Sequence, residues 1–377
     1  GNVIAGPRLY FNGAGPVPVD GTPTTEVSNI MPGPYNNLGV PGMQAIHALA
    51  PGYGSLDGLL AGQANPYFVR MASSPGTSIL QDALLQSPTF VSIWLGGNDA
   101  LGFATSGGTG TLTTPADFDF AMGTTVGALA QAGADGILIN VPDVTAIAFL
   151  NTVPYNAVPL DQATADMLNQ GFNVYNGGLQ LVQMMGLISA EEAAARTIVF
   201  AAGQNAVTID DSDLTNLSVL GLPNWRMATA NDKIVLPAST VIGTAVGGNP
   251  TQINGVSVPL ADNLVLTANE VMEAQAAISS YNATISAMAS QYGWAHFDSH
   301  AVLNQVVSAG YPMDTFNLTG DLVFGGLFSL DGVHPTARGN AFIAKLMMAE
   351  IDATYGSNLS DAGIDIGDYP TNYPNGL

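Results

Sequence analysis

Residues 90–95 of the chain have the sequence Phe-Val-Ser-Ile-Trp-Leu and are followed at once by Gly-Gly-Asn-Asp at 96–99. A short apolar run bounded by turn residues is typical of a strand that is buried on both faces. A second such run, Gly-Ile-Leu-Ile-Asn-Val-Pro at 136–142, follows a helical pattern over 116–131. Strand, helix and strand in this order predict two parallel strands joined by a crossover helix.

The same alternation continues along the chain. Further helices are predicted over 161–184, 268–291 and 336–354, and further strands over 197–200 and 294–298. This order predicts an α/β fold in which helices cover both faces of a parallel sheet.

Three segments do not follow this alternation of strands and helices. Residues 1–34 are rich in Gly, Pro and Thr, which predicts an extended surface segment, and residues 201–266 predict an insertion of hairpins and loops. We expect a single domain over 1–355 that contains this insertion. Residues 356–377 predict a loose acidic tail or linker.

Composition narrows the classes of function. The chain has 377 residues, 47% of them hydrophobic, and can bury a large core. A formal net charge of −22 would repel phosphate backbones and anionic lipid surfaces, which argues against nucleic acid as a partner. The chain has no cysteine, which excludes disulfides, thiolate nucleophiles and cysteine-ligated metals.

The same composition bears on location. Only 10% of the residues are charged, so solubility depends largely on uncharged polar side chains, a composition that we associate with secreted, cell-surface or periplasmic bacterial proteins. No apolar stretch is long enough to span a membrane, and residues 1–30 do not resemble a signal peptide.

The most specific local motif is Asp331-Gly332-Val333-His334, directly before the last predicted helix. An aspartate three residues before a histidine on one turn can accept a hydrogen bond from one ring nitrogen. The other nitrogen then faces a nucleophile as a base. The alternative is a helix-entry turn with a solvated aspartate and an incidental histidine.

Two further motifs are candidates for an oxyanion hole. Asn98 follows the strand 90–95, and its amide could donate to a developing oxyanion. Gly39 lies in the loop Asn-Asn-Leu-Gly-Val-Pro-Gly at 36–42, where its backbone N–H could be a second donor. The alternatives are an ordinary strand-ending turn and an ordinary Gly-Pro turn.

In order and context these motifs resemble the SGNH, or GDSL, hydrolase family over about residues 35–355, and they look closest to a secreted bacterial branch. The resemblance implies a three-layer α/β/α, flavodoxin-like fold and serine-type hydrolysis of a small-molecule or lipid ester without a cofactor or metal. It assigns the base to His334, its orienting carboxylate to Asp331, and the oxyanion hole to Gly39 and Asn98.

The family's Gly-Asp-Ser block is missing ahead of Gly39. Ser28 follows no buried strand, and Ser55 comes after Gly39, so both are poor candidates for the nucleophile. We therefore expect the first strand and the nucleophilic serine to lie in a segment that precedes Gly1. The alternative is a non-catalytic SGNH-like module that takes this strand from a partner chain and acts in surface binding or assembly.

Other polar residues are weaker candidates. Asp143, at the end of a predicted strand, and Trp225 and Arg226, in the predicted insertion, could edge a substrate pocket. His47 is expected to be a packed or surface histidine. Two further groups are assigned structural or solvated roles in preference to metal binding: His296 and His300 with Asp298, and the acidic residues at 210–213.

Overall fold

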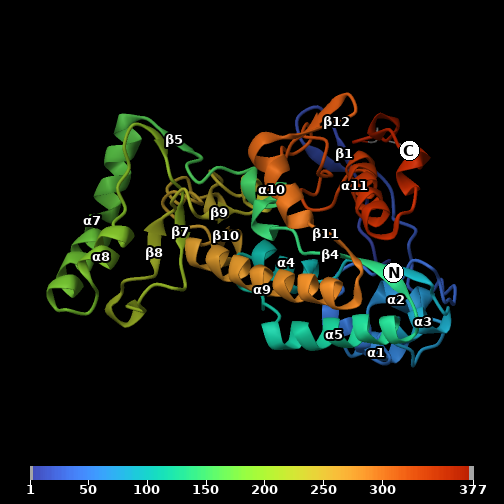
Figure 1. Cartoon of the computed structure of the whole chain (residues 1–377). Helices are drawn as coiled ribbons and strands as arrows, with labels where there is room; N and C mark the ends of the chain where they lie inside the picture. The colour runs from blue at the N-terminus through green and yellow to red at the C-terminus, as the bar shows by residue number, and fades with distance from the viewer. Residues whose placement is uncertain (1–2, 373–377) are drawn as a thin grey trace. The chain divides into compact units, whose positions relative to one another are not determined.

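The computed structural model describes residues 3–372. The chain divides into two compact units: unit 1 comprises residues 1–101, 112–147 and 275–377, and unit 2 comprises 102–111 and 148–274. The fold is mixed α/β, as predicted (Figure 1). Among the described residues, no helix is both long and apolar enough to cross a membrane.

Unit 1 contains the parallel sheet. Its strands are β3 (Phe90–Ile93), β4 (Asp135–Ile139) and β11 (Ala295–Phe297), in the order β11-β4-β3. Ser92 of β3 and Ala295 of β11 both lie opposite Ile137, so β4 is the central strand. The sequence prediction is confirmed for these three strands, each somewhat shorter than its apolar run.

Helices pack against the sheet because their apolar faces match its side chains. Ile343, Met347 and Ile351 of α11 (Ala337–Tyr355) pack against a core that includes Ile137 and Phe297. Figure 1 shows α5 (Pro115–Gln131) on the opposite side of the sheet from α11. Both helices, and α9 (Ala268–Tyr292), fall within a residue or two of their predicted bounds.

Local chemistry sets where these helices begin. Thr114 accepts a hydrogen bond from the Asp117 amide, and Pro115 takes the first helical position, where its missing N–H costs nothing. Thr336 caps α11 in the same way through the Gly339 amide. The Thr336 cap therefore fixes the start of α11 just after His334.

The remaining elements of unit 1 are short. The segment 1–34, expected to be extended, contains a small hairpin that is separate from the sheet. These elements are β1 (Leu9–Phe11), β2 (Pro16–Pro18), η1 (Ala45–Leu49), α1 (Leu56–Leu60), α2 (Pro66–Met71), α3 (Ile79–Leu85), η2 (Val144–Ala146), α10 (Ser299–Ala309), β12 (Tyr311–Met313), β13 (Phe316–Leu318), η7 (Leu359–Ala362) and η8 (Ile366–Asp368); α4 (Gly97–Thr105) runs from unit 1 into unit 2.

Residues 356–372 pack against their own unit, although the segment 356–377 was predicted to be loose; residues 373–377 lie outside the described part of the chain. Ile366 is fully buried, and its amide donates to Asp314 at 3.0 Å. Asp352 near the end of α11 accepts hydrogen bonds from the amides of Leu359 and Ser360. Side-chain carboxylates therefore hold a Gly- and Asp-rich segment that has little apolar periodicity of its own.

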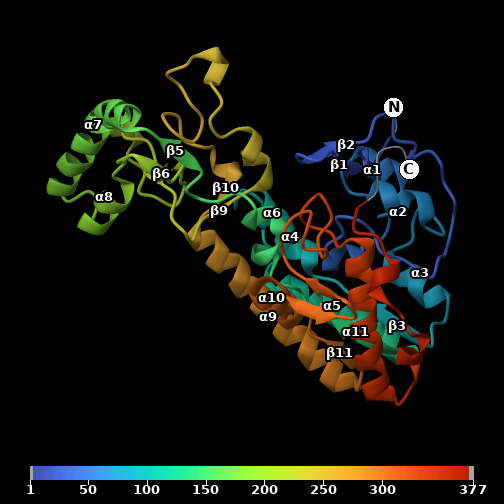
Figure 2. The ribbon, with the colours of Figure 1, turned by 90° about the horizontal axis from the view of Figure 1, so that it is seen from above.

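Unit 2 is wider than the predicted insertion, because it includes residues 102–111 and its main segment begins at Ala148 rather than near 201. Its long helix α7 (Gln162–Met184) was predicted, and Figure 2 shows it beside α8 (Ala190–Arg196). The other elements are α6 (Ala148–Asn151), β5 (Val158–Leu160), β6 (Gly203–Asn205), β7 (Thr208–Asp210), η3 (Ser218–Leu220), β8 (Trp225–Met227), β9 (Lys233–Ile234), η4 (Leu236–Thr240), η5 (Val246–Gly248), η6 (Asp262–Leu264) and β10 (Val265–Leu266).

The prediction of a strand at 197–200 is wrong, because other groups take up the backbone hydrogen bonds of this segment. The amides of Ile198 and Phe200 donate to the side chains of Asn176 and Asn169 on α7, at 3.0 and 2.8 Å. Those asparagines also donate back to the carbonyls of the same two residues. The segment's hydrogen bonds are therefore satisfied by helix side chains instead of a neighbouring strand.

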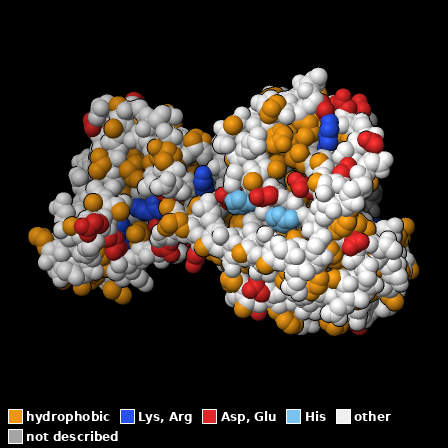
Figure 3. Space-filling view, viewed as in Figure 1, with side chains coloured by type: hydrophobic (Ala, Val, Ile, Leu, Met, Phe, Trp, Pro, Cys, Tyr) orange, Lys and Arg blue, Asp and Glu red, His pale blue; other side chains and the backbone are white. Residues whose placement is uncertain are grey.

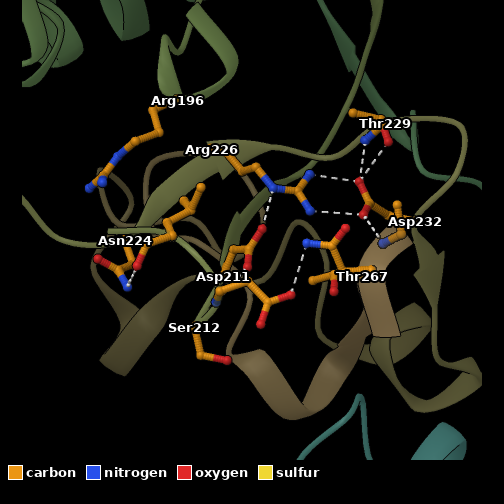
Figure 4. Close-up of polar contacts among 12 residues, drawn as sticks. Arg196, Asp211, Ser212, Asn224, Arg226, Thr229, Asp232 and Thr267 are labelled. Carbon is orange, nitrogen blue, oxygen red and sulfur yellow. Dashed lines mark hydrogen bonds and ion pairs between the residues drawn. The ribbon is translucent and has the colours of Figure 1, made fainter. Parts of the chain in front are cut away.

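A buried ion-pair network holds the sheet-poor core of unit 2 together. The Arg226 guanidinium lies between Asp211, at 2.5 Å, and Asp232, at 2.7 Å (Figure 4). Burial raises the pKa of Asp232, but the guanidinium of Arg226 outweighs burial, and the net pKa lies below its ordinary value. Asp232 also accepts from the amides of Thr229 and Ala268, so it joins three segments of the unit.

We predict that Arg226→Ala destabilises unit 2 by about 3–5 kcal/mol, because two buried carboxylates lose their cation. Hydrogen exchange of the β7 and β8 amides measures this loss. Arg8→Ala removes the same charge from an exposed site and serves as the matched control. Because the pKa of Asp232 is lowered on folding, the difference should shrink as pH falls below 3.8. An Arg226→Ala protein as stable as the control would contradict this role.

Candidate active site

The turn that carries Asp331 and His334 is closed by its own backbone. The Ser329 amide donates to the His334 carbonyl at 2.7 Å, and the Gly332 amide donates to the Ser329 carbonyl at 2.9 Å. Gly332 has φ +75°, a conformation that favours glycine. The turn is therefore fixed before α11 begins.

The side chains of this turn form the predicted pair. His334 Nδ1 lies 2.7 Å from Asp331 Oδ2. Asp331 Oδ1 accepts from the amides of Val333 and His334 and from the Ser329 hydroxyl, at 2.8, 2.9 and 2.8 Å. With its carboxylate bonded at both oxygens, Asp331 orients the ring, and Nε2 of His334 is left to act on another group.

The pair is accessible and polarised. The His334 side chain is 73% exposed and that of Asp331 is 42% exposed. The hydrogen bond that the His334 ring donates to Asp331 raises the pKa of His334 above its ordinary value, against a smaller effect of burial. Burial raises the pKa of Asp331, but His334 and the backbone amides outweigh it and bring the pKa well below its usual range. Figure 3 shows histidine and acidic side chains side by side on one face of the molecule.

Asn98 lies where the sequence predicts, just beyond the carboxyl end of β3. Its Nδ2 donates to the carbonyl of Met43 at 3.0 Å, which uses one of the two amide hydrogens and fixes the side chain. Leu38 and Leu95 pack against one apolar cluster that also contains Met43. The loop around Gly39 and the end of β3 are therefore neighbours.

The Gly39 amide has a partner of its own. It donates to Asn37 Oδ1 at 2.9 Å, within the same loop. A role as an oxyanion donor would require this bond to be shared or broken. Asn98, which keeps one amide hydrogen, is the better placed of the two predicted donors.

Asp99 has a structural role that the sequence did not reveal. It is fully buried, and its Oδ2 accepts from the Ala45 amide at 2.9 Å. Burial raises its pKa. Gly96 has φ +109°, and a Cβ there would lie 2.5 Å from the Val141 side chain. Gly96 and Asp99 thus fix the turn that presents Asn98.

In the structure, the four residues predicted for the catalytic pair and the oxyanion hole lie in two separate groups. Asp331 binds His334, and Asn98 lies beside the loop of Gly39. Among residues 3–372, no hydrogen bond or ion pair joins one group to the other. Ser329 and Met43 were missed by the sequence analysis: Ser329 carries a signal, two residues before Asp331, but the bond from Asn98 to Met43 spans 55 positions and carries none.

The visible serines considered as nucleophiles have other partners. Ser55 Oγ accepts from the Gly58 amide at 2.8 Å and caps α1. Ser28 Oγ contacts Glu26 Oε2 at 3.4 Å. Neither makes a hydrogen bond with His334.

The three predicted pocket residues lie in different units. Asp143 is buried in unit 1, where Oδ1 accepts from Thr145 and Oδ2 accepts from Gln275. In unit 2, Trp225 packs against the rings of Phe172 and Tyr175, and Arg226 belongs to the ion-pair network. Their part in a substrate pocket stays a prediction.

The other histidines have local surroundings. His47 accepts from the Gln44 amide through Nδ1 and stacks on Tyr53. Asp298, between His296 and His300, accepts from Asn140 at 2.7 Å. The described part of the chain holds no group of three or more histidine or acidic side chains that could bind a metal ion.

Comparison of the chain with protein-family models, curated proteins and solved structures gives no match in any of the three.

We predict that His334 titrates above 6.5 and that Asp331→Asn lowers its pKa, because the hydrogen bond that the ring donates to the carboxylate stabilises the imidazolium. NMR titration of the ring protons measures both values. His47, whose pKa burial lowers, should titrate below 6.5 in both proteins and is the internal control. The pair stabilises the fold below pH 6.5, and this contribution should be lost as pH rises through the raised pKa. If the pKa of His334 is the same in the Asp331→Asn protein as in the unchanged protein, the pairing is contradicted.

Proposed function

We propose that this chain is the larger part of a serine-type carboxylic ester hydrolase with a three-layer, flavodoxin-like arrangement of the SGNH kind. The proposal depends on the 2.7 Å contact between His334 Nδ1 and Asp331 Oδ2, which lie on an exposed turn whose shape is fixed by its own hydrogen bonds. A solvated helix-entry turn needs no such alignment. The presence of Asn98 beside a glycine loop at the end of a parallel strand adds the second half of an acyl-transfer site.

In the proposed reaction, a serine hydroxyl from a segment preceding Gly1 attacks the ester carbonyl. His334 Nε2 takes the serine proton as the new C–O bond forms, and Asp331 stabilises the imidazolium. The tetrahedral intermediate collapses, the alcohol leaves with that proton, and an acyl-serine remains. Water then attacks the acyl group with His334 again as base, which releases the acid and restores the serine.

The developing oxyanion is assigned mainly to the free amide hydrogen of Asn98. The bond from Asn98 to Met43 holds the side chain in place before the substrate arrives, so little reorganisation is needed. Gly39 contributes a second donor if its bond to Asn37 is exchanged for the oxyanion. No cofactor takes part, and the composition favours a secreted or cell-surface enzyme.

We predict that His334→Ala, in the native polypeptide, lowers kcat/KM for a soluble aryl ester by at least about 100-fold, since it removes the general base. Asp331→Asn should also lower it and should shift the acidic limb of the pH profile to lower pH, because the base loses the carboxylate that raises its pKa. Initial rates across pH 4–9 measure both effects.

Asp314→Asn is the matched control, since Asp314 likewise accepts hydrogen bonds from a backbone amide and a cationic side chain, and its partners are Ile366 and Lys345 instead of residues of the turn. It should retain full turnover. Unchanged turnover in a folded His334→Ala protein would rule out His334 as the base.

A further inference from the structure

Helix α7 of unit 2 has apolar side chains on two opposite faces. The inner face is buried within the unit and carries Leu168, Phe172, Tyr175, Leu179 and Val182. The outer face also carries large apolar side chains, although it is exposed. A helix that is apolar on all sides is normally covered on all sides, so we expect the outer face of α7 to have a partner.

The apolar side chains of the outer face follow a regular spacing. The outer stripe has six positions that are alternately three and four residues apart: Met167, Gln170, Val174, Gly177, Leu181 and Met184. Its four large apolar members are exposed, from 55% at Leu181 to 86% at Val174. This spacing forms the narrow apolar seam along which two helices pair as a coiled coil.

Two glycines of α7 have no packing reason within the described part of the chain. A Cβ added at Gly178 would lie 2.6 Å from the Leu222 side chain, so that position must be small. A Cβ added at Gly171 or Gly177 would meet no neighbouring group within 4 Å. Because glycine is less favourable than alanine inside a helix, these two positions point to a close approach from outside the chain.

Charge favours a second copy of the chain as the partner. The net charge of −22 opposes contact between copies over most of their surface. α7 has only one charged residue, Asp166, so two copies can meet there at little electrostatic cost. Helices that bind a membrane surface instead carry lysine or arginine on the polar face, and α7 has neither.

The outer stripe matches itself better in an antiparallel pair than in a parallel one. In the antiparallel pair, Met167 faces Met184, and Val174 faces Gly177, which leaves room for the valine. A parallel pair would set Gly177 against Gly177 and leave a gap, and it would bring the two Asp166 carboxylates to the same level. The antiparallel pair separates these carboxylates by about 28 Å along the helix axis, well beyond a Debye length of about 8 Å.

The size of the seam sets the expected strength of the pair. α7 has 23 residues and is about 35 Å long, so a seam about 10 Å wide covers about 350 Å² on each copy. Stable interfaces typically cover about 800 Å² on each partner. We therefore expect a weak dimer whose population depends on protein concentration.

We propose that the outer stripe of α7 pairs with the same stripe of a second copy to form an antiparallel, two-fold symmetric dimer. A two-fold axis requires a surface that is complementary to itself, and the stripe meets this condition when the axis passes between Val174 and Gly177. The dimer does not depend on the proposed hydrolase activity, and loss of either one leaves the other in place.

Analytical ultracentrifugation of the native polypeptide between about 1 and 300 µM tests the dimer. Val174→Glu places a carboxylate from each copy in the seam and should weaken dimerisation at least about 100-fold. Leu60→Glu adds the same charge at a 91% exposed leucine of α1 and is the matched control, which should dimerise like the unchanged protein. A monomer at every concentration, or a dimer that Val174→Glu leaves intact, would overturn the proposal.

Gly177→Met separates a lost interface from a lost fold. The new side chain occupies the space that Val174 of the second copy would enter, so dimerisation should weaken. Because methionine is a much better helix former than glycine, the melting temperature of the monomer should stay the same or rise. Undiminished dimerisation of Gly177→Met would contradict the proposed contact.

Single cysteines report the orientation, because the chain has none of its own. Met167→Cys and Met184→Cys proteins, mixed under a mild oxidant, should form a disulfide between the two variants, and neither should crosslink to itself. Self-crosslinking of each variant without a mixed product would show a parallel pair and overturn the arrangement. Binding of a monomeric protein to phosphatidylcholine vesicles, lost in Val174→Glu, would assign the stripe to a lipid surface and would also overturn the proposal.

Discussion

The hydrogen-bonding balance of β3 is the constraint on which the rest of the account depends. Backbone groups that a sheet buries need hydrogen-bond partners, since each buried group left without a partner costs about 1–3 kcal/mol and a whole domain is stable by only about 5–15 kcal/mol. β3 meets this condition on the side of β4. Among residues 3–372, its other edge pairs with no strand.

The same strand links the fold to the proposed chemistry. The loop of Gly39 and the side chain of Asn98 are both positioned from the carboxyl end of β3, through the cluster around Met43 and through the buried carboxylate of Asp99. His334 is held separately, by a turn whose geometry depends on Asp331 and Gly332. In the proposed reaction, a serine hydroxyl placed between the two groups would join them into one active site.

Much of the fold could be predicted from the sequence because its signals are local. Apolar runs predicted β3, β4 and β11, and helical patterns predicted α5 and α11. The strand predicted at 197–200 failed because Asn169 and Asn176, over twenty positions away, bond to that segment. Residues 356–372 were predicted to be loose because carboxylates, rather than apolar periodicity, hold them in place.

The site follows the same division. The contact of Asp331 with His334 is encoded within four residues and was predictable, whereas the bond that fixes Asn98 joins residues 55 positions apart and depends on how two loops pack. Arg226 illustrates the limit most clearly. A cation in a Gly- and Pro-rich region suggests a substrate pocket, but its partners Asp211 and Asp232 lie 15 and 6 positions away and engage it in a buried network.

Covalent labelling tests the central claim most directly. The native polypeptide is treated with a fluorophosphonate, which reacts with activated serines, and the labelled residue is located by peptide mass spectrometry. The account predicts one adduct, on a serine N-terminal to Gly1, that disappears in His334→Ala. An adduct on Ser28, Ser55 or any other serine within residues 1–377, or no adduct on an ester-hydrolysing preparation, would contradict it.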